Sequence, residues 1–300
     1  MQLDVRKCRS PNLTIRMVST RLHRLEKEDL KVLRYKETED IDARFSEVER
    51  TVTAWRQVLP NANAVARTEF NNRLRISLIH HDAALEGEVL SYSEIKAAVD
   101  PSIISDPSLI PSYEEIRRFD DACNFAAEQA ANKKKPFKLD TIRELYSILA
   151  PEEKAKGLPF RKENPLHRLY YHDIAAPEKI LPAMRKLGEW IDDPATKHLH
   201  AIERVATLHS RFMGIFPWAK ESGRTIRIAS NQLLQEAGYP IAIVHSIDRQ
   251  RYYEALRGDH LGLTSLYLEA VQTTAETEMR VYDEANKSPT KRRSKKSSAG

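Results

Sequence analysis

The residues best suited to chemistry in this sequence lie in the segment 216–227, FPWAKESGRTIR, between two stretches with helical periodicity. Ser222 is well placed as the N-cap of the second helix, so free backbone N–H groups and the positive end of the helix dipole would face the loop. Arg224 and Arg227 are three residues apart, so both guanidinium groups can face one phosphate chain. This combination predicts an anion site. The spacing alone equally allows two surface arginines that pair with nearby acids.

Other catalytic patterns are absent from the sequence. It contains no GxxxxGK[ST], GxGxxG, GxSxG or HExxH motif and only nine glycines from which to build such loops. Neither histidine pair, His80 with His81 or His198 with His200, has a spacing suited to chelation. The two cysteines have no CxxC spacing, which indicates free thiols and neither a disulfide framework nor a zinc site. We therefore predict no metal bound by protein ligands.

Helical elements must position this loop, because apolar residues recur at helical spacing along most of the chain. Capping boxes at Ser91 with Glu94 and at Ser112 with Glu115 mark two helix starts, and Asp140 can cap a third. Residues 15–60 are predicted to form a helical hairpin or a coiled-coil arm, and the helices that follow span about 66–86, 91–99, 112–127, 140–149, 177–191, 198–215, 223–237, 249–257 and 262–279.

The fold class is therefore all-α: a helical bundle with an N-terminal helical arm. The arm carries an apolar stripe from Ile41 to Leu59 that could form a core, dimer or docking face. Residues 151–175 look irregular, and LHRLYYHDI at 166–174 has weak strand character, from which we expect a short β-hairpin flap.

The net charge of +5 is concentrated at one end of the chain. Residues 287–300 hold six Lys or Arg and no acid, which leaves the remainder close to neutral, with 42 basic and 43 acidic residues. The body therefore has no electrostatic signature of nucleic-acid binding, and only the basic tail could supply one. No apolar run approaches the ~20 residues needed to cross a bilayer, and the first residues lack a signal-peptide pattern. We expect a cytoplasmic protein without a membrane contact.

The region 201–271 resembles the core of the Fic (Fido) domain family, whose signature is HPFx[DE]GNGRxxR. The residues that fit the family's flanking LHxxFxxI and xxxNxxLxxxGYP patterns are Leu208, His209, Phe212, Ile215, Asn231, Leu234, Gly238, Tyr239 and Pro240. The later segment DRQRYYEAL, which includes Tyr252, resembles the family's segment beside the nucleotide base. The resemblance covers roughly residues 65–275. It implies a domain that binds ATP and, in the family, transfers AMP to a protein hydroxyl.

Within the signature, this sequence departs from the family at the residues that carry its chemistry. Phe216 stands where the family has its catalytic histidine, and a phenyl ring cannot accept a proton. Lys220 stands at the acidic position that holds Mg²⁺ in the family, which makes Mg²⁺ binding doubtful. Glu221 and Ser222 replace the Gly-Asn pair, which adds a negative charge and a Cβ where the backbone approaches phosphate.

The second half of the signature is retained. Gly223, Arg224 and Arg227 match the family, and with Ser222 they form the candidate phosphate site. The resemblance adds Asn231 and Tyr252 to the candidate nucleotide-binding residues. Lys220 and Glu221 are candidates for an unusual catalytic role, as a cation in place of the metal and as a displaced base.

An earlier segment, HHDAALEGEVLSYSEI, resembles the family's autoinhibitory helix, whose pattern is [ST]xxxE[GN]. Glu86 and Gly87 are in place, and Asp82 stands at the hydroxyl position. If this assignment of residues 66–87 is correct, Glu86 lies within salt-bridge reach of Arg227. The alternative is that Glu86 ends an ordinary core helix.

Three functions remain open from the sequence. The first is a Fic-like pseudoenzyme or nucleotide-binding scaffold that acts through a protein partner, with a homodimer as one arrangement. The second is a divergent nucleotidyl- or phosphoryl-transferase that modifies a protein substrate with a non-standard active site. The third is a nucleic-acid-associated factor that uses its basic tail. The predicted organisation is an arm at 1–62, a Fic-like domain at 63–280 and a disordered basic tail at 281–300.

Overall fold

The computed structural model describes residues 41–100, 103, 110–165, 172–258 and 260–287. The chain divides into two compact units, Met1–Glu47 and Val48–Gly300. Of the first unit only residues 41–47 are described, and they are helical. The second unit begins earlier than the predicted boundary at residue 63, because residues 48–58 form a helix that buries Val48 and Val52 within this unit.

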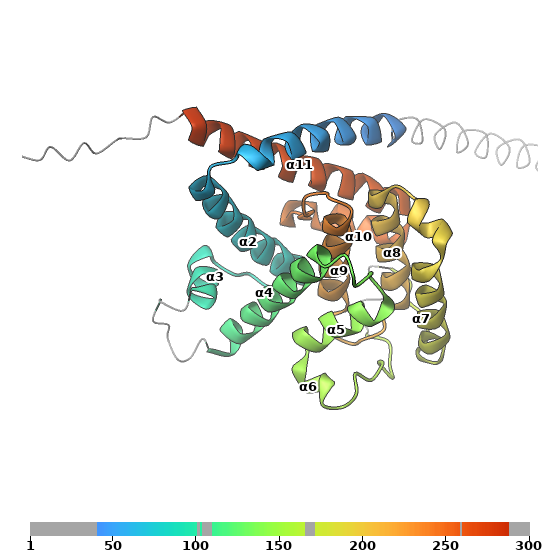
Figure 1. Ribbon diagram of the computed structural model, residues 1–300. Coiled ribbons are helices and arrows are strands. Elements are labelled where there is room, and N and C mark those ends of the chain that lie inside the picture. Colours follow the sequence, from blue (N-terminus) through green and yellow to red (C-terminus); the bar gives the residue numbers. More distant parts are fainter. Residues whose placement is uncertain (1–40, 101–102, 104–109, 166–171, 259, 288–300) are drawn as a thin grey trace, which may run out of the picture. The chain divides into compact units, whose positions relative to one another are not determined.

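The described part of the second unit is helical, and no strand occurs in it, which confirms the all-α class (Figure 1). Its elements are η1 (Leu59–Asn61), α2 (Ala64–Glu86), α3 (Tyr92–Val99), α4 (Ile110–Ala131), α5 (Leu139–Leu149), α6 (Pro151–Lys154), α7 (Pro177–Asp192), η4 (Pro194–His198), α8 (Ala201–Ile215), α9 (Ser222–Glu236), η5 (Ser246–Asp248), α10 (Arg249–Arg257) and α11 (His260–Lys287).

Several predictions of the sequence analysis fall on residues outside this description. The arm up to residue 40, residues 166–171 of the expected β-hairpin and the tail from residue 288 are among them. Residues 172–174, which are described, are not strand. Helix α11 runs to Lys287, so ordered structure continues past residue 280, where the tail was predicted to begin.

The predicted helix starts are confirmed in part. Ser91 and Glu94 form the expected capping box. Ser112 is not a cap, because α4 already begins at Ile110 and accommodates Pro111 in its first turn, where proline is tolerated. Asp140 is not a cap either, because Leu139 is already helical and Lys138 is the N-cap residue.

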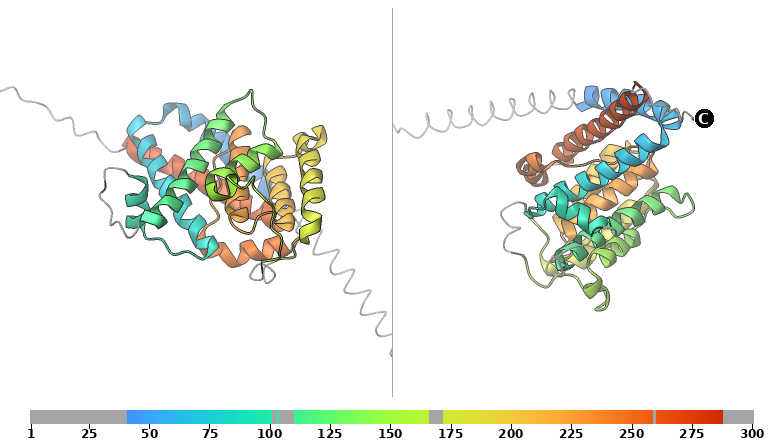
Figure 2. Two further views of the ribbon diagram at one scale, coloured as in Figure 1. Left: turned by 90° about the horizontal axis from the view of Figure 1, so that it is seen from below. Right: turned by 90° about the vertical axis from the view of Figure 1, so that its left-hand side faces the viewer.

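The apolar stripe of the arm is not an open docking face over the part that belongs to the second unit. Val48 and Val52 are fully buried, and the indole Nε1 of Trp55 donates a 2.7 Å hydrogen bond to Glu278 of α11. Figure 2 shows from two further directions how α11 passes beside α2 and α8, against which it packs. The stripe therefore serves as core here, in agreement with the simplest of the interpretations that the sequence allowed.

Helix α9 is the centre of the second unit. It packs against α4, α5 and α8, and every residue from Ser222 to Leu234 is buried. A helix that is covered on all sides is normally apolar, because buried polar groups must find partners. Helix α9 nevertheless carries two arginines in its first two turns, so the surrounding helices must supply their counter-charges. Among the described residues, no helix is long and apolar enough to cross a membrane.

Candidate functional site

The loop between α8 and α9 is tightly folded and packed. Phe216 ends α8 in the left-handed conformation, with φ of 48°, and its side chain is 1% exposed. Trp218 is fully buried and stacks on Tyr146 of α5, with ring centroids 3.9 Å apart. The aromatic side chains of the loop therefore face the core, and the phenyl ring at 216 cannot act on a ligand as an acid or base.

Arg161 ties this loop to the preceding part of the chain. Its guanidinium group donates to the main-chain carbonyls of Phe216, at 2.7 Å, and Ile215, at 3.2 Å, and its backbone N–H donates to Pro217 O. The same guanidinium group binds the carbonyl of Ala175. A buried arginine at the negative end of α8 is favoured by the helix dipole, although burial lowers its pKa. Arg161 thus fixes the position from which the loop enters α9.

The start of α9 differs from the prediction by one residue. Glu221, in the left-handed conformation with φ of 60°, is the N-cap residue, and its carbonyl accepts hydrogen bonds from the N–H and Oγ1 of Thr225. The hydroxyl of Ser222 turns back into the loop, where it donates to Trp218 O at 2.8 Å and accepts from Trp218 N at 3.1 Å. Ser222 is therefore the first helical residue, and its side chain closes the loop.

One carboxylate of α2 bridges the two arginines of α9. Asp82 Oδ2 accepts from Arg224 Nε at 3.1 Å, and Asp82 Oδ1 accepts from Arg227 Nε at 2.5 Å. The Asp82 side chain is 4% exposed, and those of Arg224 and Arg227 are 10% and 8% exposed. Both guanidinium groups therefore face one anion, as the three-residue spacing predicted. That anion is a side chain of the same protein.

Three further carboxylates complete this arrangement. Arg227 Nη2 lies 2.8 Å from Glu86 Oε1, which confirms the predicted salt bridge between these residues. Arg224 Nη2 lies 2.6 Å from Glu88 Oε2, and its Nη1 lies 3.3 Å from Glu221 Oε1. We refer to Asp82, Glu86, Glu88 and Glu221 as the carboxylate cluster, and to Arg224 and Arg227 as the arginine pair.

The charges of the site shift the pKa values of its members. Burial alone would lower the pKa of each arginine, but the nearby carboxylates, Asp82 foremost, outweigh it and raise both. Burial, with help from Glu86 and the other acids, raises the pKa of Glu221 to about 7, although Arg224 opposes the shift. Burial and the excess of negative charge in this group of four acids and two arginines both favour the neutral form of Glu221.

Two glycines allow α2 and α9 to approach each other. Gly87 ends α2 as a left-handed cap with φ of 94°, and the chain that follows brings Glu88 back to Arg224. A Cβ at Gly223 would lie 2.6 Å from Glu86 Oε1 and 2.9 Å from Arg227 Nη1. The absence of a side chain at 223 thus makes room for the ion pair between Glu86 and Arg227.

A buried chain of hydrogen bonds through Tyr267, His209 and Tyr252 ends at Arg227. Arg227 Nη1 lies 3.4 Å from the hydroxyl of Tyr252, which lies 2.9 Å from His209 Nε2, and His209 Nδ1 lies 2.7 Å from the hydroxyl of Tyr267. Because Arg227 can only donate, the Tyr252 hydroxyl is free to donate to His209, whose other nitrogen then donates to Tyr267. Burial and the charge of Arg227 lower the pKa of His209, which keeps it neutral.

Two predicted nucleotide-binding residues thus have partners within the protein. Tyr252 is fully buried behind Arg227. The carboxamide of Asn231 bonds both main-chain groups of Ala242, which donates from its N–H at 2.8 Å and accepts at its carbonyl at 3.2 Å. Asn231 therefore holds the segment after α9 in place, and its carboxamide does not point into an open pocket.

Lys220 and Glu221 lie on a cavity of about 450 Å³ beside the arginine pair, which α4, α5 and the residues around Arg161 also line. Lys220 is exposed there. Both residues line this cavity, and among the described residues no three His, Cys, Asp or Glu side chains form a group that could hold a metal ion. This donor set does not fit a divalent cation.

Comparisons with known proteins agree with the fold and the loop. Residues 136–234 match the model of the Fic/DOC family. The chain is 25% identical over 225 residues to a protein adenylyltransferase Fic of Nematostella vectensis, which covers 75% of this chain, and 25% identical over 217 residues to one of Aedes aegypti, which covers 71%. The chain spans only 51% and 42% of the lengths of these relatives.

Solved structures show the same fold. A Fic domain containing signaling protein of Bacteroides thetaiotaomicron superposes with a TM-score of 0.69 at 20% identity, over 79% of this chain and 98% of that one. Fic-1 of C. elegans superposes with a TM-score of 0.68 at 18% identity, over 93% of this chain and 79% of that one. This chain is a helical protein of the Fic fold. Residues 136–234, which match the Fic/DOC family model, lie within this fold.

The sequence analysis missed the central role of Asp82 and the contributions of Glu88 and Arg161. A signal for Asp82 was present, because Asp82 and Glu86 are four residues apart and share one face of α2. Glu88 and Arg161 lie in irregular segments between helices, whose contacts depend on the path of the chain and leave no periodic pattern.

Proposed function

We propose that this chain is a nucleotide-binding Fic protein that does not perform the family's AMP transfer and acts through a protein partner, as a pseudoenzyme. One observation carries the proposal: the arginine pair, which is the part of the signature suited to phosphate, is bonded throughout to the carboxylate cluster of the same chain. In this arrangement the guanidinium groups suited to phosphate are present, but carboxylates of the same chain occupy them.

The loss of transfer chemistry rests on the first half of the loop. AMP transfer to a hydroxyl requires a group that accepts the hydroxyl proton, and the phenyl ring of Phe216 is buried and has no basic atom. Removal of a general base typically costs about 10²–10⁴-fold in rate. The cation of Lys220 at the metal position adds to this loss.

The closed state supports an autoinhibitory role for α2. A nucleotide phosphate that reaches the arginine pair must replace Asp82 as well as Glu86, because Asp82 occupies the Nε atoms of both arginines. Removal of Glu86 alone leaves this bridge intact. Opening therefore requires the C-terminal half of α2 to withdraw or both carboxylates to be removed.

The test uses the variant Asp82→Ala/Glu86→Gly with ATP labelled at the α-phosphate; the variant frees Arg227 from both of its carboxylates and leaves Arg224 with Glu88 and Glu221 only. We expect ATP to bind this variant without transfer of label to any protein in an extract. Transfer of label that disappears on a further Arg224→Ala change would show an active transferase and overturn the proposal. The matched control Asp120→Ala also removes a buried acid that pairs with an arginine of α2, at a site away from the loop.

A divergent nucleotidyltransferase is the second candidate, and the pKa of Glu221 favours it. A carboxylate whose pKa is raised to about 7 can accept a proton near neutral pH, and Glu221 lines the same cavity as Lys220 and Arg224. In this reaction Glu221 takes the proton of a target hydroxyl, whose oxygen attacks the α-phosphate while pyrophosphate leaves. Label transfer that is lost in Glu221→Gln, with a rate that rises as the pH passes about 7, would establish this candidate.

A further inference from the structure

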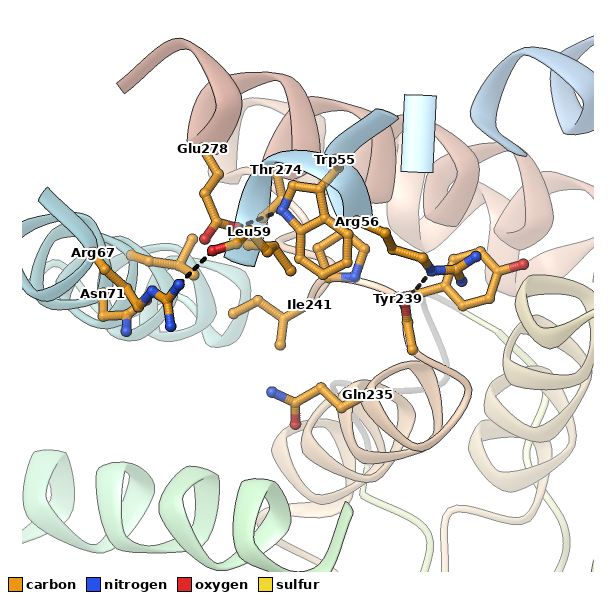
Figure 3. A pocket seen from close by; sticks show the side chains of 13 residues that line it. Trp55, Arg56, Leu59, Arg67, Asn71, Gln235, Tyr239, Ile241, Thr274 and Glu278 are labelled. Atoms are coloured by element: carbon orange, nitrogen blue, oxygen red, sulfur yellow. Dashed lines mark hydrogen bonds between the residues drawn. The ribbon is translucent and has the colours of Figure 1, made fainter. Parts of the chain in front are cut away.

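A second cavity of about 560 Å³ lies in the same unit, away from the signature loop (Figure 3). It is formed by the helix over residues 48–58, the start of α2, the end of α9 and the middle of α11. Arg67 and Glu86 are nineteen residues apart on α2, so about 28 Å of helix separates this cavity from the carboxylate cluster. The volume is in the range typical of small-molecule sites.

Two arginines lie on opposite sides of this cavity. Arg56 Nε donates to the carbonyl of Gly238 at 3.0 Å and lies over the ring of Tyr239 at 5.1 Å, and Arg67 Nη2 donates to the carbonyl of Leu59. In the described part of the chain neither forms a salt bridge with an acid. Each guanidinium group is thus held by a main-chain carbonyl and a tyrosine hydroxyl, that of Tyr239 for Arg56 and that of Tyr282 for Arg67, and of its five N–H donors some remain for an anion.

The rest of the lining suits a flat, polar ring. Figure 3 shows the indole of Trp55 on the wall between the two arginines, with Asn71 beside Arg67 and Gln235 on the facing wall. Indole and phenol faces bind planar rings, and each carboxamide offers both a donor and an acceptor to a ring edge.

A buried acid completes the lining. Glu278 is 7% exposed, accepts from Trp55 Nε1 and from the hydroxyl of Tyr282 at 2.6 Å, and has lone pairs left for a ring N–H. The two arginines and this one carboxylate leave a net positive charge.

We propose that this cavity is a second ligand site, which binds a nucleoside monophosphate or a molecule with the same chemistry, a hydrogen-bonding planar ring that carries an anionic group. The ring lies against Trp55, its edge meets Asn71 and Gln235, and the anionic group binds Arg67 or Arg56. The site shares no lining residue with the cavity beside the signature loop, so this proposal stands independently of the proposed function.

The test is titration calorimetry of the full chain with AMP, GMP, CMP, UMP, benzoate and inorganic phosphate at low salt. We expect at least one nucleoside monophosphate to bind saturably and to change the fluorescence of Trp55. Arg67→Met should weaken this binding by about tenfold, as for one lost charge-assisted contact. The matched control Arg73→Met makes the same change on the same helix, at an exposed residue paired with Glu69 outside the cavity, and should leave the affinity unchanged.

Three outcomes would overturn the proposal. The first is that no nucleoside monophosphate binds saturably. The second is that benzoate or phosphate binds as tightly as the nucleotides, which would mean that the ring edge is not recognised. The third is that Lys220→Met weakens binding while Arg67→Met and Gln235→Leu do not, which would place the ligand beside the signature loop. Arg67 and Gln235 lie at the surface of the cavity, so we expect these variants to fold, and a thermal melt verifies this.

Discussion

The two arginine pairs of this protein differ in what holds them. Arg224 and Arg227 lie in the buried first turns of α9 and bind four carboxylates. Arg56 and Arg67 line an open cavity and are held by main-chain carbonyls. A carbonyl orients a guanidinium group without neutralising it, whereas a carboxylate does both. Arg224 and Arg227, within the family signature, are therefore not available to an external anion, whereas Arg56 and Arg67, outside it, are available.

This difference shows that the presence of arginines in a motif does not establish a phosphate site. The availability of the arginines depends on the acids that the fold brings to them, here from α2, about 140 residues earlier in the chain. The four predictions below test the contrast, beginning with the largest expected effect.

The largest effect is expected from Asp82→Ala, which removes the carboxylate shared by both buried arginines. Removal of one partner from a buried ion pair typically costs about 3–5 kcal/mol of stability. The same change frees the Nε atoms of both arginines, while Glu86 still holds Arg227 and Glu88 still holds Arg224, so ATP should bind more tightly than to the parent but less tightly than to Asp82→Ala/Glu86→Gly. Urea denaturation and calorimetry measure the two effects.

Asp120→Ala is the control for that experiment, because Asp120 pairs with Arg75 of α2 and is also buried. It should reduce the stability without any gain in ATP affinity. Equal gains in the two variants would mean that loosening of α2, and not release of the arginine pair, opens the site.

The second prediction concerns Glu221→Gln and pH. The folded state raises the pKa of Glu221 from 4.5 to about 7, so between these values the folded protein binds more protons than the unfolded one, and stability from this group is lost as the pH rises. Glu221→Gln should therefore be more stable than the parent at pH 8, by about 1–3 kcal/mol, and the advantage should vanish below about pH 4.5. A difference that is constant from pH 4.5 to 8 would contradict the raised pKa.

The third prediction uses Gly223→Ala to test the approach of Glu86 to α9. The new Cβ would lie 2.6 Å from Glu86 Oε1, so the ion pair with Arg227 must shift, at a cost of about 1 kcal/mol. In the Glu86→Gly background the contact with Glu86 is gone and only the 2.9 Å contact with Arg227 Nη1 remains, so the same change should cost less. A double-mutant cycle by urea denaturation measures this reduction. The same destabilisation in both backgrounds would show that Glu86 is not the neighbour that matters.

The smallest effect is expected from Arg67→Met. This exposed arginine has no acid partner among the described residues, so its loss should change the free energy of unfolding by at most about 0.5 kcal/mol. Arg227→Met, the matching change in the buried pair, should cost about 3–5 kcal/mol, because it leaves Asp82 and Glu86 partly uncompensated. Similar losses in the two variants would remove the distinction between the pairs.

Much of this architecture could be predicted from the sequence. Apolar periodicity marked α8, α9 and α10 to within a few residues, and the family resemblance predicted the ion pair between Glu86 and Arg227. These features depend on local spacing or on a motif, both of which are visible in one sequence.

The remainder depends on packing between distant segments. The orientation of the Ser222 hydroxyl follows from the left-handed Glu221, which no pattern in the loop indicates. The hydrogen bonds of Asp82 to both Arg224 and Arg227 depend on the position of α2 along α9, which is set by packing. The second cavity exists because residues 48–59 pack against α11. The sequence alone predicted only a stripe of apolar residues over this segment and gave no sign of its packing partner.

The most direct test of the closed arginine pair is the affinity for ATP of the parent protein and of the Asp82→Ala/Glu86→Gly variant, measured by calorimetry in an Arg67→Met background so that the second cavity does not contribute. Removal of these two carboxylates frees Arg227 and the Nε atom of Arg224, which should tighten binding by about tenfold or more, the equivalent of one or more recovered charge-assisted hydrogen bonds. Equal affinity of the two proteins would contradict the account, because it would show that the carboxylate cluster does not compete with phosphate for Arg224 and Arg227.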